Sequence, residues 1–404
     1  MQLEYKKPSS ELLDGFLIAL LIVFEVCYSQ ALLMMVFVFI FRLLLTNKLN
    51  KLFISSFTLW YILLMMVINI EGLRVSTGDQ FSLLYNTTTF ICVILVQLIL
   101  MQYQGNFLNV IEKSAVIASI MAGVYILFKE YHMLVYRWKD FISGNSGYRL
   151  GVSSNINPNS IAWAFGILAL LTIYFTIQKR SILLFFVYVW ELVIILFTGS
   201  KNGLLLALIP IFYYGIKTLK KMNIKFLVIT SAALVMLWIA IHGLPILYTL
   251  IGRRIDSALF TIGFNDGSGG NVIDAGSTEK RLDMVNVAIK MFSDKPILGW
   301  GIGAFAIYSG FGYYCHNNYM EVLVSGGIVL FLFYYIPILI LSLKSLCMVS
   351  GPKKDLAIML LITVFLLDFS TVNFYSNIVF LIRIAVIFEL AIWNQKGKET
   401  NEEV

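Results

Sequence analysis

His316 stands where a polar stretch of the chain meets a long apolar one, in the sequence YYCHNNYMEVLVSGG from Tyr313 to Gly327. It is one of 3 histidines in the chain, and Asn317 and Asn318 follow it directly. An imidazole has a pKa of about 6.5, so a histidine can accept a proton from a hydroxyl group near neutral pH. A histidine in this position can also cap a helix or lie at a membrane interface, and the residue type alone leaves these roles open.

Arg281 lies in a second polar stretch, GSTEKRLDMVNVAIKMFSDKPILGWGIGAF. Five of its residues recur at helical spacing and predict an amphipathic helix over residues 278–293, namely Arg281, Val285, Ala288, Ile289 and Phe292. Proline cannot continue a helical hydrogen-bond ladder, so Pro296 and the two residues before it should end this helix. The glycine-rich GWGIG that follows comes after a helix instead of a strand, which argues against a dinucleotide-binding loop and favours a tight turn beside a site.

The rest of the chain, which must position these residues, is strongly apolar. Its 404 residues are 59% hydrophobic and 13% charged, and the mean hydropathy is +0.84. A soluble domain has about 45–50% apolar and about 25% charged residues. The apolar blocks are continuous, whereas the strands of a membrane barrel would alternate in segments of about ten residues. The composition therefore predicts an all-α, polytopic membrane protein and excludes an ordinary soluble one.

Most apolar blocks are long enough to cross about 30 Å of hydrocarbon at about 1.5 Å per residue. This length rule predicts about 12 transmembrane helices. They fall at roughly 12–28, 31–47, 52–70, 81–102, 114–128, 161–177, 181–198, 203–217, 226–250, 318–343, 356–370 and 374–394. We expect residues 1–404 to form a single integral membrane domain, with residues 251–317 as a large extracytoplasmic loop that contains short helices.

Lysine and arginine are concentrated in alternate connections between the expected spans. With the N-terminus inside, the connections on that side carry Lys6, Lys7, Lys48, Lys51, Lys113, Lys179, Arg180, Lys217, Lys220, Lys221, Lys225, Lys344, Lys353, Lys354, Lys396 and Lys398. Short basic connections are typical of the cytoplasmic side, so both termini are expected there. The net charge of +7 then reflects topology and contact with membrane lipid. It gives no argument for nucleic acid as a partner.

Neither the cysteines nor the carboxylates form a metal-binding pattern. Cys27, Cys92, Cys315 and Cys347 include no CxxC pair. We therefore expect no metal and no cofactor. Cys315 beside His316 has the residue types of a thiol nucleophile, but a small residue at a helix mouth is the simpler interpretation.

Asp368 and Arg383 are charged residues in the last two expected spans. Charges within spans are functional suspects by default. A structural ion pair between the two residues explains their presence equally well.

Several of these motifs together resemble the O-antigen ligase and polymerase family, whose members are integral membrane enzymes of lipid-linked glycan pathways. The resemblance rests on Arg281 in a loop helix, on DKPILGWGIGAF after it, and on HNNYMEVLVSGG at the start of a span. It extends to YRLGVSSNINPNSIAWAFG before a middle span and to FTGSKNGLLLALIP before the span at 203–217. The family's many spans and its large late loop also match the expected architecture.

The resemblance implies a membrane glycosyltransferase whose donor is an undecaprenyl-pyrophosphate-linked oligosaccharide. The implied catalytic residues are His316 and Arg281, and the implied ligands of pyrophosphate or glycan are Lys201, Arg149 and Asn317. The family usually has an arginine where this chain has Lys201, which keeps the charge but loses the bidentate fork of a guanidinium. The resemblance also implies a bacterial plasma or inner membrane, with a chain-length regulator and a flippase of the same pathway as partners.

Two reactions fit within this family. A polymerase joins lipid-linked repeat units of O-antigen or capsular polysaccharide, whereas a ligase moves a finished glycan onto lipid A core or a protein. The divergent motifs and Lys201 favour the polymerase.

Two other function classes fit the architecture. A flippase for lipid-linked oligosaccharides has a similar number of spans, but a carrier typically has broken polar segments near midspan in two related halves. A scaffold of a cell-envelope assembly would tolerate replacement of the charged loop residues.

Overall fold

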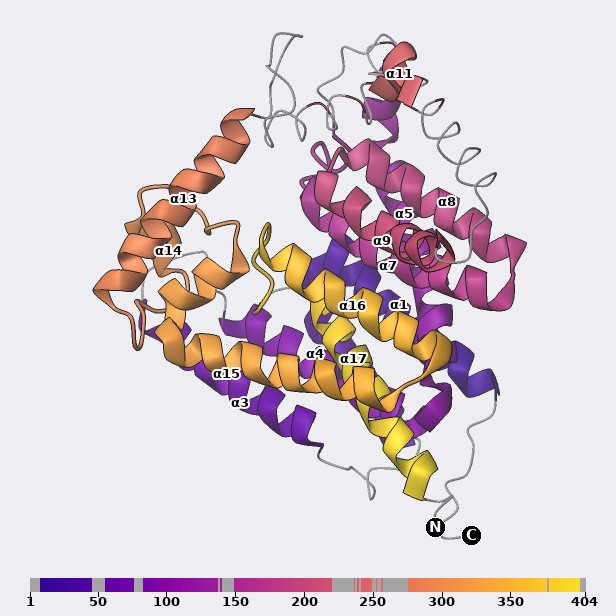
Figure 1. Cartoon of the computed structure of the whole chain (residues 1–404), viewed down its shortest axis with the longest axis horizontal. Coiled ribbons are helices and arrows are strands. Elements are labelled where there is room, and N and C mark those ends of the chain that lie inside the picture. The colour runs from indigo at the N-terminus through magenta and orange to yellow at the C-terminus, as the bar shows by residue number, and fades with distance from the viewer. Residues whose placement is uncertain are drawn as a thin grey trace. The chain divides into compact units, whose positions relative to one another are not determined.

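Figure 1 shows the protein as a computed structural model, which describes residues 8–45, 55–75, 83–136, 149–219, 275–375 and 378–399 and scattered positions between 139 and 256. All regular secondary structure in these residues is helical, so the prediction of an all-α chain is confirmed. Contacts divide the chain into two compact units, which are described separately. Unit 1 comprises residues 1–118 and 280–404, and unit 2 comprises residues 119–279.

Unit 1 contains the helices from both ends of the chain. They are α1 (Pro8–Cys27), η1 (Ser29–Ala31), α2 (Leu32–Leu45), α3 (Ser56–Leu73), α4 (Leu83–Leu100), η3 (Met101–Asn106), α14 (Ala304–Tyr308), α15 (Asn318–Met348), α16 (Gly351–Asp368) and α17 (Ile378–Glu399), together with most of α13 (Ala275–Asp294). Helix α4 packs against α2, α3 and α17, and α15 packs against α17, α16 and α3. Helix α5 (Phe107–Tyr136) leads from unit 1 into unit 2.

The helices of unit 2 that follow α5 are α7 (Pro158–Lys179), α8 (Ile182–Thr198), α9 (Lys201–Leu219) and the short α11 (Pro245–Leu247). Small residues allow α7 and α9 to pack closely. A Cβ atom on Gly203 would lie 2.6 Å from the carbonyl oxygen of Ala162, and one on Gly166 would lie 2.8 Å from the Cβ of Leu206. Small residues at such interfaces bring helix backbones together in membrane proteins. The glycines of the two motifs in this region therefore have a packing role.

In the part of the chain that the structure describes, five helices are long and apolar enough to cross a membrane, which supports a multi-pass membrane protein. They are Ser56–Leu73, Leu83–Tyr103, Phe107–Tyr136, Pro158–Lys179 and Asn318–Met348. The expected spans overlap helices, although the span at 226–250 lies mostly outside the described residues and contains only short helical pieces such as α11. The count of about 12 spans is not confirmed, since α8, for example, has 17 residues and is shorter than the bilayer core at about 1.5 Å per residue.

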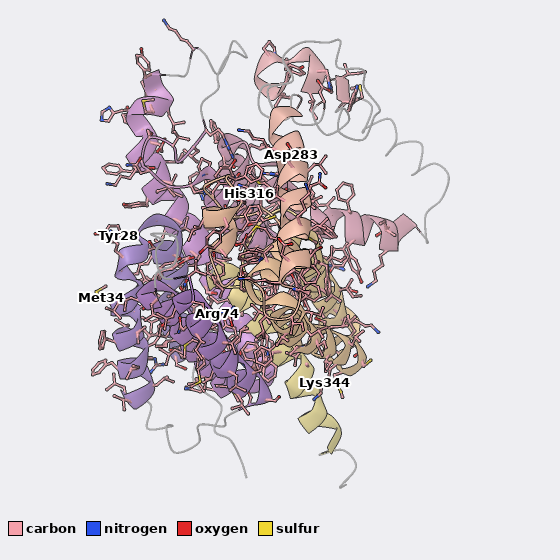
Figure 2. All side chains as sticks on the ribbon, turned by 90° about the vertical axis from the view of Figure 1, so that its left-hand side faces the viewer. Tyr28, Met34, Arg74, Asp283, His316 and Lys344 are labelled. Atoms are coloured by element: carbon pink, nitrogen blue, oxygen red, sulfur yellow. The ribbon has the colours of Figure 1, made fainter. Side chains whose placement is uncertain are left out.

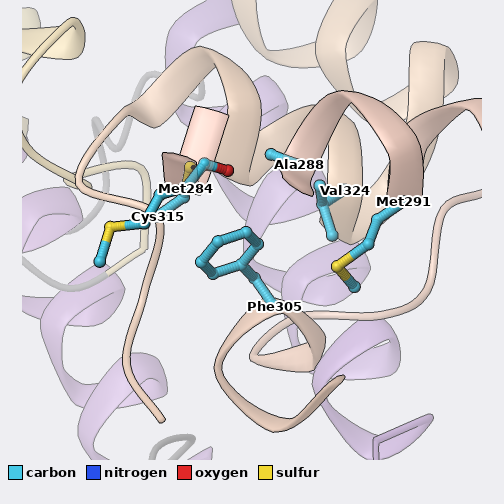
Figure 3. Packing of buried hydrophobic residues seen from close by; sticks show 6 residues of the cluster. All are labelled: Met284, Ala288, Met291, Phe305, Cys315 and Val324. Carbon is cyan, nitrogen blue, oxygen red and sulfur yellow. Dashed lines mark hydrogen bonds between the residues drawn. The ribbon is translucent and has the colours of Figure 1, made fainter. Parts of the chain in front are cut away.

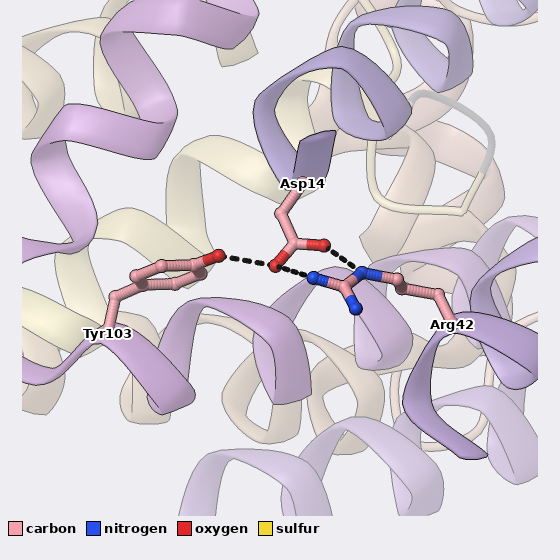
Figure 4. A network of polar contacts seen from close by, with 3 residues as sticks. All are labelled: Asp14, Arg42 and Tyr103. Atoms are coloured by element: carbon pink, nitrogen blue, oxygen red, sulfur yellow. Dashed lines mark hydrogen bonds and ion pairs between the residues drawn. The ribbon is translucent and has the colours of Figure 1, made fainter. Parts of the chain in front are cut away.

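Charged side chains of unit 1 are paired where they enter apolar helices. Asp14 of α1 accepts hydrogen bonds from Arg42 Nε at 2.6 Å and from Tyr103, and Figure 4 shows these three side chains converging from α1, α2 and η3. Lys113 Nζ lies 2.7 Å from Glu11 Oε2, which forms a second ion pair between α5 and α1. Buried charges are retained in such surroundings only when they are paired, so these contacts hold the helices in register.

Candidate active site

His316 and Asn317 form the mouth of α15. Asn317 is the N-cap, because its Oδ1 accepts a hydrogen bond from Met320 N at 3.0 Å. Its side-chain carbonyl is therefore occupied by the helix, and its amide NH₂ is the group left to contact a ligand. His316 has a φ of +55°, in the left-handed region where asparagine, aspartate and histidine are the most frequent residues after glycine. Non-glycine residues in this region are held by their surroundings and cluster at functional sites.

Helix α13 packs beside this mouth. The predicted helix over 278–293 is confirmed, and it ends at Asp294 as expected. Its buried face consists of Met284, Ala288 and Met291, which pack with Phe305, Cys315 and Val324, as Figure 3 shows. Ile289, predicted on the apolar face, is 47% exposed. The predicted face is correct at Ala288 and wrong at Ile289, and the sequence interpretation did not include Met284 and Met291.

The His316 imidazole is half-buried and lies against two tyrosine rings. Its ring centroid is 4.4 Å from that of Tyr314 and 5.7 Å from that of Tyr313. Burial lowers the pKa of His316, and the positive charge of Arg281 lowers it further, to about 4. Burial is the larger of the two causes. Near neutral pH the imidazole is therefore neutral and its free ring nitrogen can accept a proton.

Arg281 supplies the positive charge at this mouth from the first half of α13. The chain folds Cys315 against α13, with its Sγ 3.8 Å from the carbonyl oxygen of Met284, one helical turn from Arg281. Within the described residues, no hydrogen bond or ion pair engages the Arg281 guanidinium. Figure 2 shows His316 in unit 1 together with Asp283, which lies on the same helix as Arg281. The sequence-predicted pair of catalytic residues is thus brought together by the fold.

Glu321 is a residue of this mouth that the sequence interpretation missed. It is fully buried in the first turn of α15, and its Oε2 accepts a hydrogen bond from Cys315 N at 2.8 Å. Its Oε1 has no partner in the part of the chain that the structure describes. The contact holds the peptide directly before His316 and so restricts the backbone that presents the imidazole. A carboxylate five residues after the histidine, on an otherwise apolar helix, was the available signal.

Burial also decides the role of Cys315. It raises the pKa of the Cys315 thiol, and the nearby Glu321 carboxylate raises it further. A thiolate is the nucleophilic form of cysteine, and a raised pKa disfavours it near neutral pH. Cys315 is therefore a packing residue of the cluster around Phe305, which agrees with the simpler interpretation of the sequence.

The GWGIG motif docks on a break in α15. Gly326 and Gly327 have non-helical backbone angles, with a φ of +61° at Gly327. The neighbouring turn binds the backbone that the break exposes, since Trp300 N donates to the carbonyl of Val324 at 2.8 Å and Gly301 N donates to that of Ser325 at 2.7 Å. A Cβ atom on Gly299 would lie 2.5 Å from the oxygen of Val324. Gly299 is thus needed for close backbone approach, and the expectation of a tight turn is confirmed.

A buried polar network lies behind the mouth. Asn318 Nδ2 donates to Asp368 Oδ2 at 3.1 Å, and the Tyr335 hydroxyl donates to the same oxygen at 2.7 Å. Asn373 Nδ2 donates to the other carboxylate oxygen at 2.7 Å. Arg383 donates from Nη1 to Thr363 at 3.3 Å, and its charge interacts favourably with that of Asp368, as a structural role of the two residues requires. The network fixes the first turn of α15 to the end of α16.

Arg149 and Lys201 belong to unit 2. Arg149 donates from Nε to the carbonyl of Thr198 at 2.8 Å and from Nη2 to Asn159 Oδ1 at 2.8 Å. Thr198 ends α8, and Lys201 is the first residue of α9, so the two predicted cations lie at the turn between these helices. The N-terminus of a helix favours anions. Among the described residues, no group of three or more His, Cys, Asp or Glu could hold a metal ion.

Residues 184–335 match the model of a protein family described as O-Antigen ligase. The match confirms the family resemblance. The matched segment includes Lys201, Arg281, His316 and Asn317, while Arg149 lies outside it. No curated protein matches the chain. The O-antigen ligase match supports a glycosyltransferase-type enzyme that acts on lipid-linked glycans in a membrane, and the apolar helices agree with it.

Proposed function

We propose that the protein is a polymerase that transfers oligosaccharide repeat units from undecaprenyl pyrophosphate to a sugar hydroxyl of a second lipid-linked unit. The observation that carries this proposal is the neutral imidazole of His316 beside the charge of Arg281, inside the O-antigen ligase segment. Lys201, at the position where the family usually has arginine, favours a divergent polymerase over a ligase. The ligase, with lipid A core or protein as acceptor, is the second candidate.

His316 is the proposed base of the transfer. A sugar hydroxyl is too weak an acid to ionise unaided, so its proton passes to the free nitrogen of the imidazole as the oxygen attacks the anomeric carbon. The bond between this carbon and the pyrophosphate oxygen breaks, and the pyrophosphate leaves with the bonding electrons. An imidazolium with a pKa of about 4 then returns its proton readily to the departing pyrophosphate or to water.

Arg281 is proposed to stabilise the charge that develops on the leaving pyrophosphate. Fixed cations act most strongly where water is excluded and where charge grows in the transition state. A guanidinium without other hydrogen bonds can bind two phosphate oxygens at once. Separately, Arg149 and Lys201 are proposed to bind pyrophosphate. The Asn317 amide is proposed to bind the glycan. The donor's pyrophosphate bond supplies the driving force, so the proposal requires no cofactor.

The setting of the reaction is proposed to be the outer face of a bacterial plasma or inner membrane. The charge pattern of the short connections supports a position of the 251–317 loop on that face and of both termini in the cytoplasm. The donor would be delivered by the flippase of the same pathway, and a chain-length regulator would act on the product.

The surface polysaccharide of a deletion strain, resolved on a gel, tests the proposal. We expect single repeat units on the acceptor and loss of the ladder of longer chains. Long lipid-linked chains without glycan on the acceptor would identify a ligase, and units retained on the cytoplasmic face would identify a flippase. An unchanged ladder would contradict all three.

A further inference from the structure

The turn formed by residues 296–298, termed turn 296–298 below, combines exposed apolar side chains with carbonyl groups that are bonded to protein donors. Ile297 is 64% exposed and Leu298 is 57% exposed. Their side chains therefore do not belong to the core of unit 1. Scattered exposed apolar residues are ordinary on a protein surface. The hydrogen bonding of the backbone is therefore the evidence on whether this turn faces water or lipid.

Each carbonyl of this turn has a protein donor. The oxygen of Pro296 accepts from Ile328 N at 2.8 Å, and the oxygen of Ile297 accepts from Val329 N at 3.3 Å. The oxygen of Leu298 accepts from Arg74 Nη1 at 3.0 Å, and that of Gly299 accepts from Arg74 Nη2 at 3.4 Å. A loop in water leaves many carbonyls to the solvent. In hydrocarbon an unsatisfied backbone group costs several kcal/mol, so the internal bonds to these carbonyls favour a place for the turn at the edge of the bilayer.

The turn also lies level with two candidate spans. Ile328 and Val329, which donate to it, are exposed residues inside the span Asn318–Met348. They begin an exposed apolar stripe on α15 that continues through Leu332, Ile336 and Leu339. Arg74, labelled in Figure 2, directly follows α3, whose last residue Leu73 is 65% exposed. Turn 296–298 is thus continuous with the lipid-facing surface of both helices.

The residues beside the turn have the chemistry of a membrane interface. The Lys295 ammonium lies 3.8 Å from the centroid of the Trp300 ring, and Trp300 Nε1 donates to the carbonyl of Met291 at 2.7 Å. Lysine and tryptophan are favoured at the level of lipid headgroups, where an apolar body meets a polar environment. Lys295 and Trp300 would then lie at the level of the headgroups on either side of turn 296–298, whose apolar side chains lie slightly deeper in the bilayer.

We propose that turn 296–298 inserts into the hydrocarbon edge of the bilayer, with Ile297 and Leu298 among the acyl chains, and anchors the C-terminal end of α13 to the membrane. The partner is the phospholipid bilayer. The insertion holds α13, which carries Arg281, at the depth where a lipid headgroup lies. This proposal does not depend on the reaction that the protein catalyses.

Fluorescence in lipid nanodiscs tests the insertion. In a background with Cys27, Cys92, Cys315 and Cys347 replaced by alanine, Ile297→Cys is labelled with the dye NBD, and Lys290→Cys on the exposed face of α13 is the matched control. The nanodiscs contain phosphatidylethanolamine and phosphatidylglycerol. We expect the dye at position 297 to emit at shorter wavelength, to be quenched by a nitroxide on the lipid acyl chain and to be shielded from iodide. The dye at position 290 should show the opposite behaviour.

The proposal is overturned if iodide quenches both positions equally while the nitroxide lipid quenches neither. Gel filtration and thermal unfolding establish that each labelled protein is folded. If Ile297→Cys does not fold, Leu298→Trp with brominated lipids gives an independent measurement. Quenching of this tryptophan above that of the unsubstituted protein supports insertion, and unchanged quenching contradicts it.

Discussion

At the scale of single residues, the neutral form of His316 is the property with the largest chemical consequence. Burial and the charge of Arg281 both disfavour the imidazolium, so the residue is ready to accept a proton over the whole physiological pH range. A lowered pKa also makes it a weaker base. A bound pyrophosphate would offset part of this effect, because its negative charge favours the imidazolium.

The pH dependence of transfer by the purified enzyme follows from this pKa. A base must be neutral, so activity should fall as the pH drops through the pKa of His316. We expect the acid limb of kcat/KM near 4, where the free enzyme titrates, and the limb of kcat at higher pH, since the bound donor raises the pKa.

Substitution of His316 separates proton transfer from positioning. His316→Ala should lower the rate by about 10²–10⁴, and His316→Gln should lower it by a similar factor, because glutamine can cap or contact a sugar but cannot take up a proton. Initial rates with a lipid-linked donor measure both. A glutamine variant with normal turnover would show that His316 only positions the acceptor.

The neighbouring Lys280 provides a matched control for substitution of Arg281. Arg281→Ala should reduce the rate by about 10²–10³, the range for loss of one group that stabilises transition-state charge. Arg281→Lys should recover little, because an ammonium cannot bind two phosphate oxygens in the same geometry. Lys280→Ala removes an exposed charge from the same helix and should change nothing. Equal polymer levels in Arg281→Ala and Lys280→Ala cells would assign Arg281 to the solvated surface.

Glu321 is expected to act through the backbone before His316. Glu321→Gln keeps an oxygen that can accept the Cys315 N–H bond and should retain most activity. Glu321→Ala leaves that buried N–H unsatisfied, at about 1–3 kcal/mol, and should lower both thermal stability and turnover. The acid limb of kcat/KM should stay in place in the glutamine variant. A displaced limb would indicate that the carboxylate itself takes part in the proton transfer.

At the scale of elements, the site depends on the interruption of α15 at two glycines. The glycines at 326 and 327 interrupt α15, and the turn at 296–301 binds the exposed backbone groups. Non-helical backbone at membrane depth is tolerated only where other protein groups satisfy it. The short first part of α15, which follows His316, therefore does not share the axis direction of the long second part.

Two glycines with the same backbone requirement test this docking. Gly299 has a φ of +59° and Gly303 has a φ of +83°, but only at Gly299 would a Cβ atom meet backbone atoms. Gly303→Ala should cost about 1–2 kcal/mol for the left-handed conformation alone. Gly299→Ala should cost clearly more, because the turn must separate from α15. Thermal unfolding in detergent compares them, and equal losses would contradict the docking argument.

At the scale of the whole molecule, the orientation of α15 can be tested with a natural cysteine. Cys347 is exposed at one end of this helix, and Lys290 is exposed on α13 beside its other end. We expect a membrane-impermeant maleimide to label Lys290→Cys in intact cells and to reach Cys347 only after permeabilisation. The reverse pattern would overturn the orientation and, with it, the proposed setting of the reaction. Lys220 and Asp266, which the charge pattern places on opposite sides, lie outside the described residues.

The sequence by itself determined the properties that depend on neighbouring residues along the chain. Hydropathy over consecutive residues predicts apolar helices, and a proline after Asp294 predicts where α13 ends, because both effects act within a few turns. The motifs around Arg281 and His316 were sufficient to indicate the family.

Only the tertiary structure decided how these residues act together. The pKa of His316 depends on its burial and on Arg281, which is 35 residues away in the chain (316 − 281). The buried face of α13, the break in α15 and the contact of Glu321 with Cys315 likewise depend on what packs beside each element. Desolvation and packing are set by atoms that come close in space, and local spacing in a sequence does not contain that information.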